Sequence, residues 1–252
     1  SFELFGETFF VPLSGDFNIR NAAMAASAAH YYGIPTESIR TALAAFQGIR
    51  RRQEVRGVVR GITIIDDFGH HPTAIRETLA GLRKKFGPVR LWALFEPRSN
   101  TTRRAVFQND LPKAFAEADG VFISQVARLD QLPENERLKP DQVVSDIAAT
   151  GKPAFYEPTA DSIIERLKPL AKSGDVVLVF SNGGFGNIHA KLLDRLDLTA
   201  LEHLAAAQIR FELERAVQAL LGEETLVLSR REQDKLVDDI FHEVTGLGPL
   251  DS

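Results

Sequence analysis

The stretch Ile64-Ile65-Asp66-Asp67-Phe68-Gly69-His70-His71-Pro72-Thr73 organises the rest of the sequence around it. The apolar run over residues 62–65 predicts a buried strand, because β-branched side chains suit a pleated surface that is covered on both sides. Pro72 suits the first turn of a helix, where its missing N–H is no loss. Apolar residues then follow at helical spacing. A strand, a polar turn and a helix in this order place ligand-binding groups at the carboxyl end of an α/β sheet.

Composition excludes several classes of protein. Of the 252 residues, 44% are hydrophobic and 25% are charged, which is ordinary for a soluble globular chain. The formal net charge of -4 gives no basic face for nucleic acid. The absence of cysteine excludes disulfides and thiolate metal sites, and it is compatible with the cytoplasm. No apolar run approaches the roughly 20 residues of a membrane span. We therefore expect a soluble, cytoplasmic protein that does not bind nucleic acid and has no membrane span.

Strand-like and helical patterns alternate from residue 55 to about residue 196. Strands are predicted at residues 62–65, 89–95, 120–124, 154–156 and 176–180. Helices are predicted at residues 73–86, 109–117, 141–149, 160–171 and 187–196, with an irregular loop at 128–140. This alternation predicts an α/β fold, in which a Rossmann-like, mostly parallel sheet is covered by helices.

Polar turns follow three of these strands. Besides the turn at Asp66 and Asp67, the strings are Glu96-Pro97-Arg98-Ser99-Asn100-Thr101 and Ser181-Asn182-Gly183-Gly184-Phe185-Gly186. Because the carboxyl ends of parallel strands meet at one edge of a sheet, we expect the three turns to converge on a binding cleft. In particular, Asp67, Arg98 and Asn182 are predicted to line a common crevice.

A simpler interpretation of the first turn is that its carboxylates end the strand and its histidines are solvated. A metal site made by Asp66, His70 and His71 is disfavoured, because adjacent histidines seldom share one ion and zinc spacing is not met. We predict no metal site. The glycines at 183, 184 and 186 do not follow the Gly-x-Gly-x-x-Gly order, but glycine lets a backbone approach a ligand closely.

Short strands at residues 2–5 and 8–13 and helices at residues 21–32 and 37–46 are predicted before this sheet. Gly15-Asp16-Phe17-Asn18-Ile19-Arg20-Asn21-Ala22 opens the first of these helices. Asn18 and Asn21 suit two roles equally, as helix caps or as amides that offer a donor and an acceptor to a ligand. Arg50-Arg51-Arg52 is either a solvated cluster or a phosphate contact.

Two of these strings together indicate a family. Asp66-Asp67-Phe68-Gly69-His70-His71-Pro72-Thr73 resembles the signature of the Mur ligases that act on UDP-N-acetylmuramate. Residues 15–22 resemble the Gly-x-His-Asn-x-x-Asn-Ala element of the family's central domain, with Phe17 in place of the histidine. The resemblance covers about residues 1–196. It implies that residues 1–47 end a central ATP-binding domain, that 48–196 form the C-terminal domain, and that 197–252 are a helical tail.

The resemblance implies ATP-driven amide synthesis, in which ATP with Mg²⁺ phosphorylates the lactyl carboxylate of UDP-N-acetylmuramate and an amine then displaces phosphate. Residues 96–101 and 181–186 are similar to the branch that adds the murein tripeptide L-alanyl-γ-D-glutamyl-meso-diaminopimelate during peptidoglycan recycling. The branch that adds L-alanine is an alternative, and so is a non-enzymatic interaction module. The sequence holds no Gly-x-x-x-x-Gly-Lys-[Ser/Thr] phosphate loop and no UDP-sugar domain. We therefore expect a fragment that is inactive by itself.

Individual roles are implied by the same resemblance. For ATP these are Asn18 at the adenine edge, Asn21, Arg52, and Asp67 on the ribose hydroxyls. His70 and His71 are placed beside the phosphates and the incoming amine, as the candidate catalytic residues. The substrate-binding residues are Arg98, Ser99, Asn100, Ser181, Asn182, Gly183 and Gly184.

The tail shows a different pattern. Apolar residues recur every three or four positions over residues 198–220, which predicts an amphipathic helix that ends at Gly222. A capping box at Ser229 opens a second helix, and residues 242–250 follow it. This pattern resembles the helical segment ahead of the ATPase core in secretion and pilus-assembly ATPases. Such helices need an apolar partner, which is the preceding domain, each other or another chain.

Overall fold

The computed structural model describes residues 1–202, 213, 215 and 230–245. The chain divides into two compact units, Ser1–Asp194 and Arg195–Ser252. Within the described ranges, no helix is both long and apolar enough to cross a bilayer.

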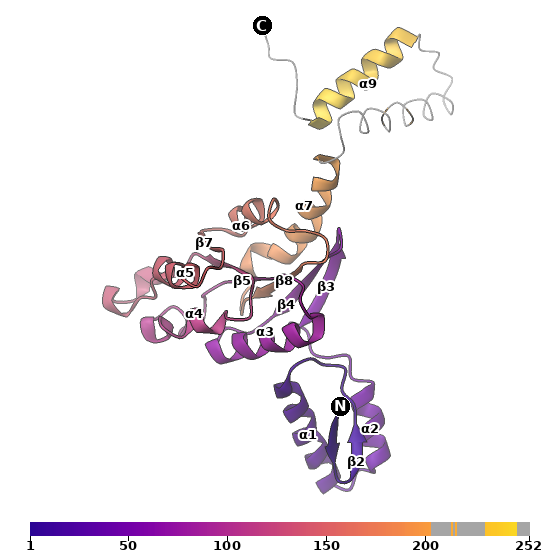
Figure 1. Cartoon of the computed structure of the whole chain (residues 1–252), viewed down its shortest axis with the longest axis vertical. Coiled ribbons are helices and arrows are strands. Elements are labelled where there is room, and N and C mark those ends of the chain that lie inside the picture. The colour runs from indigo at the N-terminus through magenta and orange to yellow at the C-terminus, as the bar shows by residue number, and fades with distance from the viewer. Residues whose placement is uncertain (203–212, 214, 216–229, 246–252) are drawn as a thin grey trace. The chain divides into compact units, whose positions relative to one another are not determined.

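A six-stranded sheet forms the centre of the first unit, and its strand order is β3-β4-β8-β5-β6-β7 (Figure 1). Five strands run parallel, and β3 is antiparallel to β4 at one edge. The bounds are β3 Glu54–Val59, β4 Ile62–Asp67, β5 Leu91–Phe95, β6 Gly120–Ser124, β7 Ala154–Glu157 and β8 Val176–Phe180. The predicted mostly parallel α/β fold is confirmed. Strand β3 is not among the predicted strands, and it reaches β4 through a two-residue turn with positive φ at Arg60 and Gly61.

Helices cover the sheet, and the main core lies beneath them. Their bounds are α3 Pro72–Phe86, α4 Leu111–Ala114, α5 Pro140–Ala148, α6 Ala160–Leu167 and α7 Ile188–Glu202. The predicted helix at residues 109–117 is reduced to the four residues of α4. The chain leaves helical geometry at Phe115, whose ring packs into the core against Phe95 and Phe180. Tertiary packing therefore overrides the local helical pattern. The loop predicted over residues 128–140 is irregular up to residue 139, with two single 3₁₀ turns, Leu129–Gln131 and Glu134–Glu136, and an isolated bridge between Arg137 and Arg104, and α5 begins at Pro140.

The N-terminal residues form a small layer of their own, with a core of Phe9, Ala26 and Ile39. It consists of β1 Phe2–Leu4, β2 Glu7–Phe9, α1 Asp16–Tyr31 and α2 Thr36–Ala44. Strand β2 ends at Phe9 and not at residue 13 as predicted, because Phe9 pairs with Phe2, the first residue of its partner strand β1. Helix α1 begins five residues earlier than predicted, at Asp16 after Gly15, whose φ of 97° is comfortable only for glycine.

In the second unit, α9 Arg230–Thr245 matches the second helix predicted for the tail. The first predicted tail helix, over residues 198–220, lies largely outside the described residues, and α7 covers its beginning.

Candidate functional site

Three neighbouring strands bring their polar turns together. Asp67 of β4 and Phe95 of β5 are both register partners of Phe180 in β8. The backbone N–H of Ser181 donates to the carbonyl of Asp67 (3.1 Å), and the N–H of Glu96 donates to that of Phe180 (3.0 Å). The turns that follow β4, β8 and β5 thus start at one level of the sheet. Their predicted convergence on one edge is confirmed.

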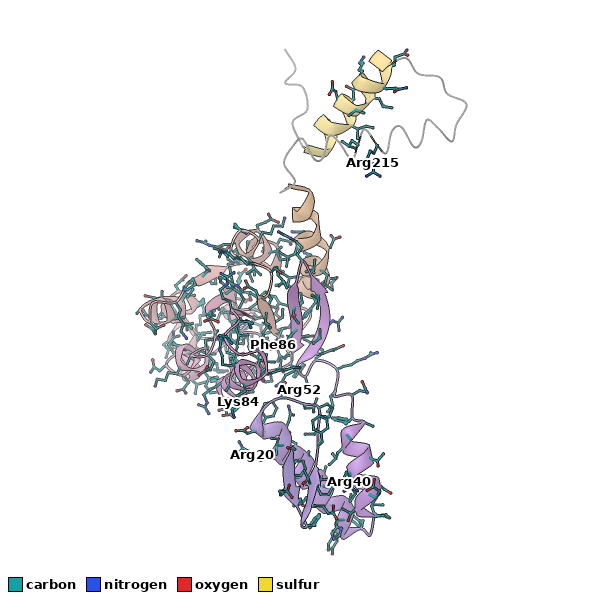
Figure 2. All side chains as sticks on the ribbon, turned by 45° about the vertical axis from the view of Figure 1, so that its right-hand side comes forward. Arg20, Arg40, Arg52, Lys84, Phe86 and Arg215 are labelled. Carbon is teal, nitrogen blue, oxygen red and sulfur yellow. The ribbon has the colours of Figure 1, made fainter. Side chains whose placement is uncertain are left out.

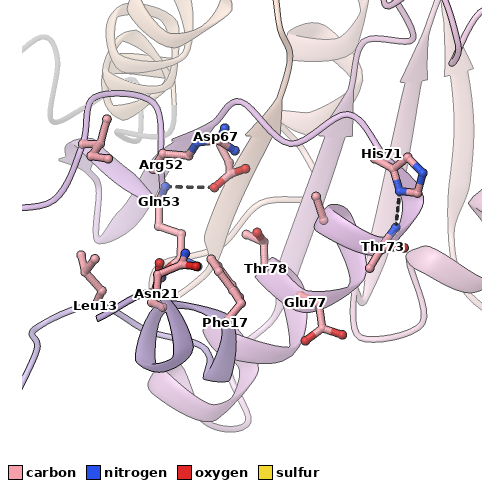
Figure 3. Close-up of a pocket in the computed structure, with 13 residues that line it drawn as sticks. Leu13, Phe17, Asn21, Arg52, Gln53, Asp67, His71, Thr73, Glu77 and Thr78 are labelled. Carbon is pink, nitrogen blue, oxygen red and sulfur yellow. Dashed lines mark hydrogen bonds between the residues drawn. The ribbon is translucent and has the colours of Figure 1, made fainter. Parts of the chain in front are cut away.

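A cavity of about 560 Å³ lies beside this edge, between the first unit's N-terminal layer and its sheet (Figure 3). All four residues predicted to bind ATP line it. Asn18 and Asn21 come from α1, Arg52 from the segment before β3, and Asp67 from the end of β4. Arg52 is exposed where the two layers meet (Figure 2). The other lining residues are Leu13, Phe17, Ile49, Gln53, His71, Thr73, Ala74, Glu77 and Thr78.

The α1 side of the cavity offers an apolar face and an amide. Phe17, Leu13 and Ile49 supply apolar surface, which suits the face of a planar base. The Nδ2 of Asn18 donates to the Ser14 carbonyl (2.7 Å), so its Oδ1 is the group left to accept a hydrogen bond. An adenine amino group is such a donor. Asn21 is exposed on the next turn of α1.

Asp67 is only 3% exposed and has a structural task as well. Its Oδ1 accepts from the N–H of Gly69 (2.7 Å), and its Oδ2 accepts from the N–H of Gln53 (3.0 Å). Burial raises the pKa of this carboxyl, and the two N–H donors offset only part of that effect. Asp67 thus ties the turn after β4 to the segment before β3, and its oxygens retain lone pairs for further donors.

Asp66 points to the opposite face of the sheet, because successive side chains of a strand alternate. Its Oδ2 lies 3.2 Å from Nε of Arg51, and its Oδ1 lies 3.2 Å from Nε2 of His189. The latter pair is within ion-pair distance but lacks hydrogen-bond geometry. Burial alone would raise the pKa of Asp66, yet the imidazole of His189 and the guanidinium of Arg51 together lower it. Asp66 is therefore an internal charge partner and not part of the cavity.

The two histidines carry their protons on different nitrogens when they are neutral. Nδ1 of His71 accepts from the N–H of Thr73 (3.2 Å), so the proton sits on Nε2. Nδ1 of His70 lies 3.1 Å from the Phe68 carbonyl, which can only accept, so His70 has a bare Nε2. His71 lines the cavity, and His70 does not. One ring thus offers a donor and the other an acceptor near the same turn.

The residues predicted to bind the peptide lie along the other two turns. Arg98 is exposed, and its Nη1 lies 3.6 Å from Oε1 of Glu96. The chain packs Arg98 directly on Gly183, where an added Cβ would lie 2.5 Å from Cδ of Arg98. Gly184 is exposed beside it. Neither Arg98 nor Asn182 lines the cavity that contains Asp67. The three residues lie on turns at the same sheet edge, but the prediction that all three line one crevice is wrong for this cavity, which takes in only Asp67.

Three residues predicted to bind substrate form hydrogen bonds through their side chains to other residues of the chain. Ser181 is fully buried, and its hydroxyl donates to Oε2 of Glu96 and accepts from the N–H of Gly183. Ser99 bonds through Oγ to Thr102. Oδ1 of Asn100 accepts from Arg103 (2.8 Å). These side chains shape the two turns from within.

Sequence reasoning missed several lining residues. Thr73 and Glu77, like Ala74 and Thr78, are four positions apart along α3, so all four share one helical face. That spacing was a usable signal once Asp67 had been placed on the same side of the sheet. Gln53 gave no such signal, because its role depends on the course of the backbone before β3. In the part of the chain that the structure describes, no three His, Cys, Asp or Glu residues form a metal-binding group.

Comparison with known proteins assigns this chain to a family. Residues 50–183 match the model of the Mur ligase, glutamate ligase domain. The chain belongs to the Mur ligase family. The match begins in the segment before β3 and ends in the turn after β8, so it takes in the whole sheet of the Mur ligase domain.

Individual relatives are consistent with this. The chain is 42% identical over 185 residues to the UDP-N-acetylmuramate–L-alanyl-γ-D-glutamyl-meso-2,6-diaminoheptandioate ligase of Escherichia coli, which covers 73% of this chain and 38% of that protein. It is 31% identical over 186 residues to a UDP-N-acetylmuramate–L-alanine ligase of Caldanaerobacter subterraneus, which covers 74% of this chain and 40% of that protein. A crystal structure of a murein peptide ligase from Psychrobacter arcticus superposes with a TM-score of 0.59 at 36% identity, over 75% of this chain and 38% of that one. The chain thus spans about two fifths of these relatives.

The tail matches a different model. Residues 186–245 match the type II secretion system protein E, N-terminal domain. This match begins in the turn before α7 and ends with α9, in agreement with the resemblance that the tail sequence shows.

Proposed function

We propose that the protein serves in ATP-dependent amide synthesis, in which the tripeptide L-alanyl-γ-D-glutamyl-meso-diaminopimelate is joined to UDP-N-acetylmuramate. One observation carries the nucleotide half of this proposal. Asn18, Asn21, Arg52 and Asp67 come from separate segments and line a single cavity. We further propose that residues 1–47 are the end of the central ATP-binding domain and that residues 48–196 are the C-terminal domain.

In this proposal the cavity holds the nucleoside part of ATP. Phe17 stacks on the base, Oδ1 of Asn18 accepts from its amino group, and Asp67 accepts from the ribose hydroxyls. Arg52 sits at the mouth, where its guanidinium lies 5.5 Å from the Phe68 ring and can turn to a phosphate. The cavity is large enough for a nucleoside and has the mixed apolar and polar lining that such ligands need.

The proposed reaction proceeds in two steps, a phosphoryl transfer and an attack by the amine. The γ-phosphoryl group of ATP passes to the lactyl carboxylate, which leaves ADP and an acyl phosphate. The tripeptide's amine then attacks the carbonyl carbon, forms the amide bond and expels inorganic phosphate, while the nitrogen loses its proton. The bare Nε2 of His70 is suited to accept that proton, and Nε2–H of His71 is suited to donate to a phosphate oxygen. These steps depend mainly on positioning and charge neutralisation.

The described residues alone do not provide a binding site for Mg²⁺. Among the described residues, no three His, Cys, Asp or Glu side chains form a group that could hold a metal ion by themselves. Nor does the sequence hold a phosphate loop for the γ-phosphate. We therefore propose that the residues described supply the nucleoside and peptide sides, and that this chain does not turn over ATP by itself.

The tripeptide is favoured over L-alanine as the amine donor by the turn after β5. Arg98 presents an exposed guanidinium there, next to Gly183, and a guanidinium fork suits the several carboxylates of the tripeptide. The L-alanine-adding activity is the second candidate, because relatives with that name share 31% identity with this chain.

Nucleotide binding to the complete 252-residue chain tests the proposal. The Asn21→Ala variant removes an exposed amide from the cavity wall, so the fold should stay intact while the Kd for ADP rises about tenfold. Arg20→Ala is the matched control, because Arg20 is the exposed neighbour that does not line the cavity. Titration calorimetry measures both. Equal Kd values for the two variants and the wild type would contradict the proposal that this cavity binds the nucleotide. A parallel titration with tripeptide and with L-alanine decides between the two amine donors.

The tail calls for a separate proposal, which rests on its match to the secretion-protein domain. We propose that residues 197–252 bind another protein chain through the apolar residues that recur in their sequence. The mass in solution of the full chain and of a chain that ends at Leu196 tests this. A higher-mass species that disappears on truncation supports the proposal. If the full chain and the truncated chain are both monomeric, the proposal is contradicted.

A further inference from the structure

Arg51 connects the segment before β3 with the turn after β8. Its Nη2 donates to the carbonyls of Ser181 (2.6 Å) and Gly183 (2.9 Å), and its Nε donates to Oδ2 of Asp66 (3.2 Å). Ser181 and Gly183 lie more than a hundred positions from Arg51 in the sequence. A planar guanidinium has the fixed geometry to hold two carbonyls and one carboxylate at once, which a lysine ammonium lacks.

The backbone of Arg51 is held as firmly as its side chain. Its φ of 59° lies in the left-handed region, which is uncommon for a residue with a Cβ. Its N–H donates to Oε2 of Glu54 (2.8 Å), and its carbonyl accepts from the N–H of Phe68 (2.7 Å). The guanidinium also lies 5.3 Å from the centre of the Phe68 ring. A strained conformation with so many partners is typical of a residue that positions a functional site.

The turn that Arg51 holds is the one that carries the predicted peptide residues. Asn182 lies between the two carbonyls that Arg51 binds, and its Oδ1 is buried without a partner among the described residues. Gly183 lies directly against Arg98, since an added Cβ would come within 2.5 Å of Cδ. Movement of this turn would therefore displace Asn182 and Arg98 together.

The residues that follow Arg51 lead to the nucleotide cavity. Arg52 and Gln53 both line it, and the N–H of Gln53 binds Asp67. We propose that Arg51 is a positioning residue, which sets the turn at residues 181–184 in register with the nucleotide cavity. The assignment of peptide binding to that turn rests on the function proposed above. The mechanical link between Arg51 and the turn does not.

Hydrogen–deuterium exchange of the full chain tests the link without any ligand. In Arg51→Ala, amides of residues 181–187 should exchange about tenfold faster, because two carbonyls of the turn lose a charged donor. Strands β5 and β6 should keep their protection. Arg51→Gly removes the same side chain but accepts a positive φ freely, so it should accelerate exchange to the same extent. Arg50→Ala, an exposed neighbour, is the control and should match the wild type.

Three results would overturn the proposal. These are unchanged exchange at residues 181–187, faster exchange that spreads equally to β5 and β6, and normal exchange in Arg51→Gly, which would assign the effect to backbone strain. Titration then separates this link from the function. Arg51→Ala should bind the tripeptide about tenfold more weakly and ADP within about threefold of the wild type. A wild-type chain that binds no tripeptide would refute the proposed peptide role, whereas the exchange data would still decide on Arg51.

Discussion

Replacement of Gly81 by alanine probes how the cavity is held open. Gly81 lies in the middle of α3, where alanine alone would favour the helix by about 1 kcal/mol. A Cβ at this position would nevertheless lie 2.9 Å from Cα and 3.1 Å from N of Gly15. Ordinary contacts begin at 3.4 Å, so the backbone of Gly15 must move by roughly 0.5 Å. No flexible side chain can absorb this shift.

The shift of Gly15 acts through α1 on the residues that we propose to bind the nucleotide. Gly15 immediately precedes α1, which carries Phe17, Asn18 and Asn21 into the cavity. Their displacement relative to Asp67 should raise the Kd for ADP about five- to tenfold, which is roughly 1–1.4 kcal/mol. The free energy of unfolding should fall by no more than about 2 kcal/mol, because the helix gain of about 1 kcal/mol offsets part of an over-packing cost of about 1–3 kcal/mol.

Titration calorimetry with ADP and urea denaturation measure the two effects. Lys84→Ala is a suitable control, because it breaks the exposed ion pair with Asp16 between the same two helices without a steric shift. We expect the ADP affinity of this control to match the wild type. If Gly81→Ala also binds ADP normally, the contact between α3 and Gly15 does not set the cavity, and the reasoning is refuted.

Two further predictions concern buried polar groups. Ser181→Ala removes the hydroxyl donor to buried Glu96 and should lower the free energy of unfolding by about 1–3 kcal/mol in urea denaturation; an unchanged midpoint would show that Glu96 does not depend on it. Because folding lowers the pKa of Asp66, its contribution is present above the ordinary value of 3.8 and is lost as the pH falls through the lower folded value. Asp66→Asn should therefore flatten the loss of stability below about pH 4, and a variant that loses stability as steeply as the wild type would contradict this. Asp67, whose pKa is raised, contributes with the opposite sign and loses its contribution as the pH rises above 3.8.

Much of the fold was accessible from the sequence because the apolar runs are simple. The predicted strands over residues 62–65, 120–124 and 176–180 are fully or largely buried, and such runs allow only a covered parallel sheet. Helix α4 was over-predicted, because the burial of Phe115 could not be seen in a local pattern. Strand β3 was not assigned, because it is a mostly exposed edge strand in which Gly57 interrupts a short apolar run and Val55 and Val58 face solvent.

The candidate site was accessible only in part. Strand ends predicted that Asp67 and the turn after β8 would share an edge. The different tasks of Arg51 and Arg52 were not predictable, since Arg51 binds Asp66 and two carbonyls of a turn that is distant in the sequence, while Arg52 lines the cavity. The role of Ser181 was not predictable either. A serine after a strand can contact a ligand or, as here, donate a hydrogen bond to a buried carboxylate, that of Glu96.

Chemical-shift mapping of the isotope-labelled full chain tests the central claim most directly, which is that one sheet edge carries a nucleotide cavity and a separate peptide turn. ADP should shift the amide signals of residues 17–21, 52–53 and 67–78, and the tripeptide added afterwards should shift those of residues 98–100 and 182–184. Shifts from either ligand that are confined to other parts of the sheet, such as α5 and β7, would contradict the account.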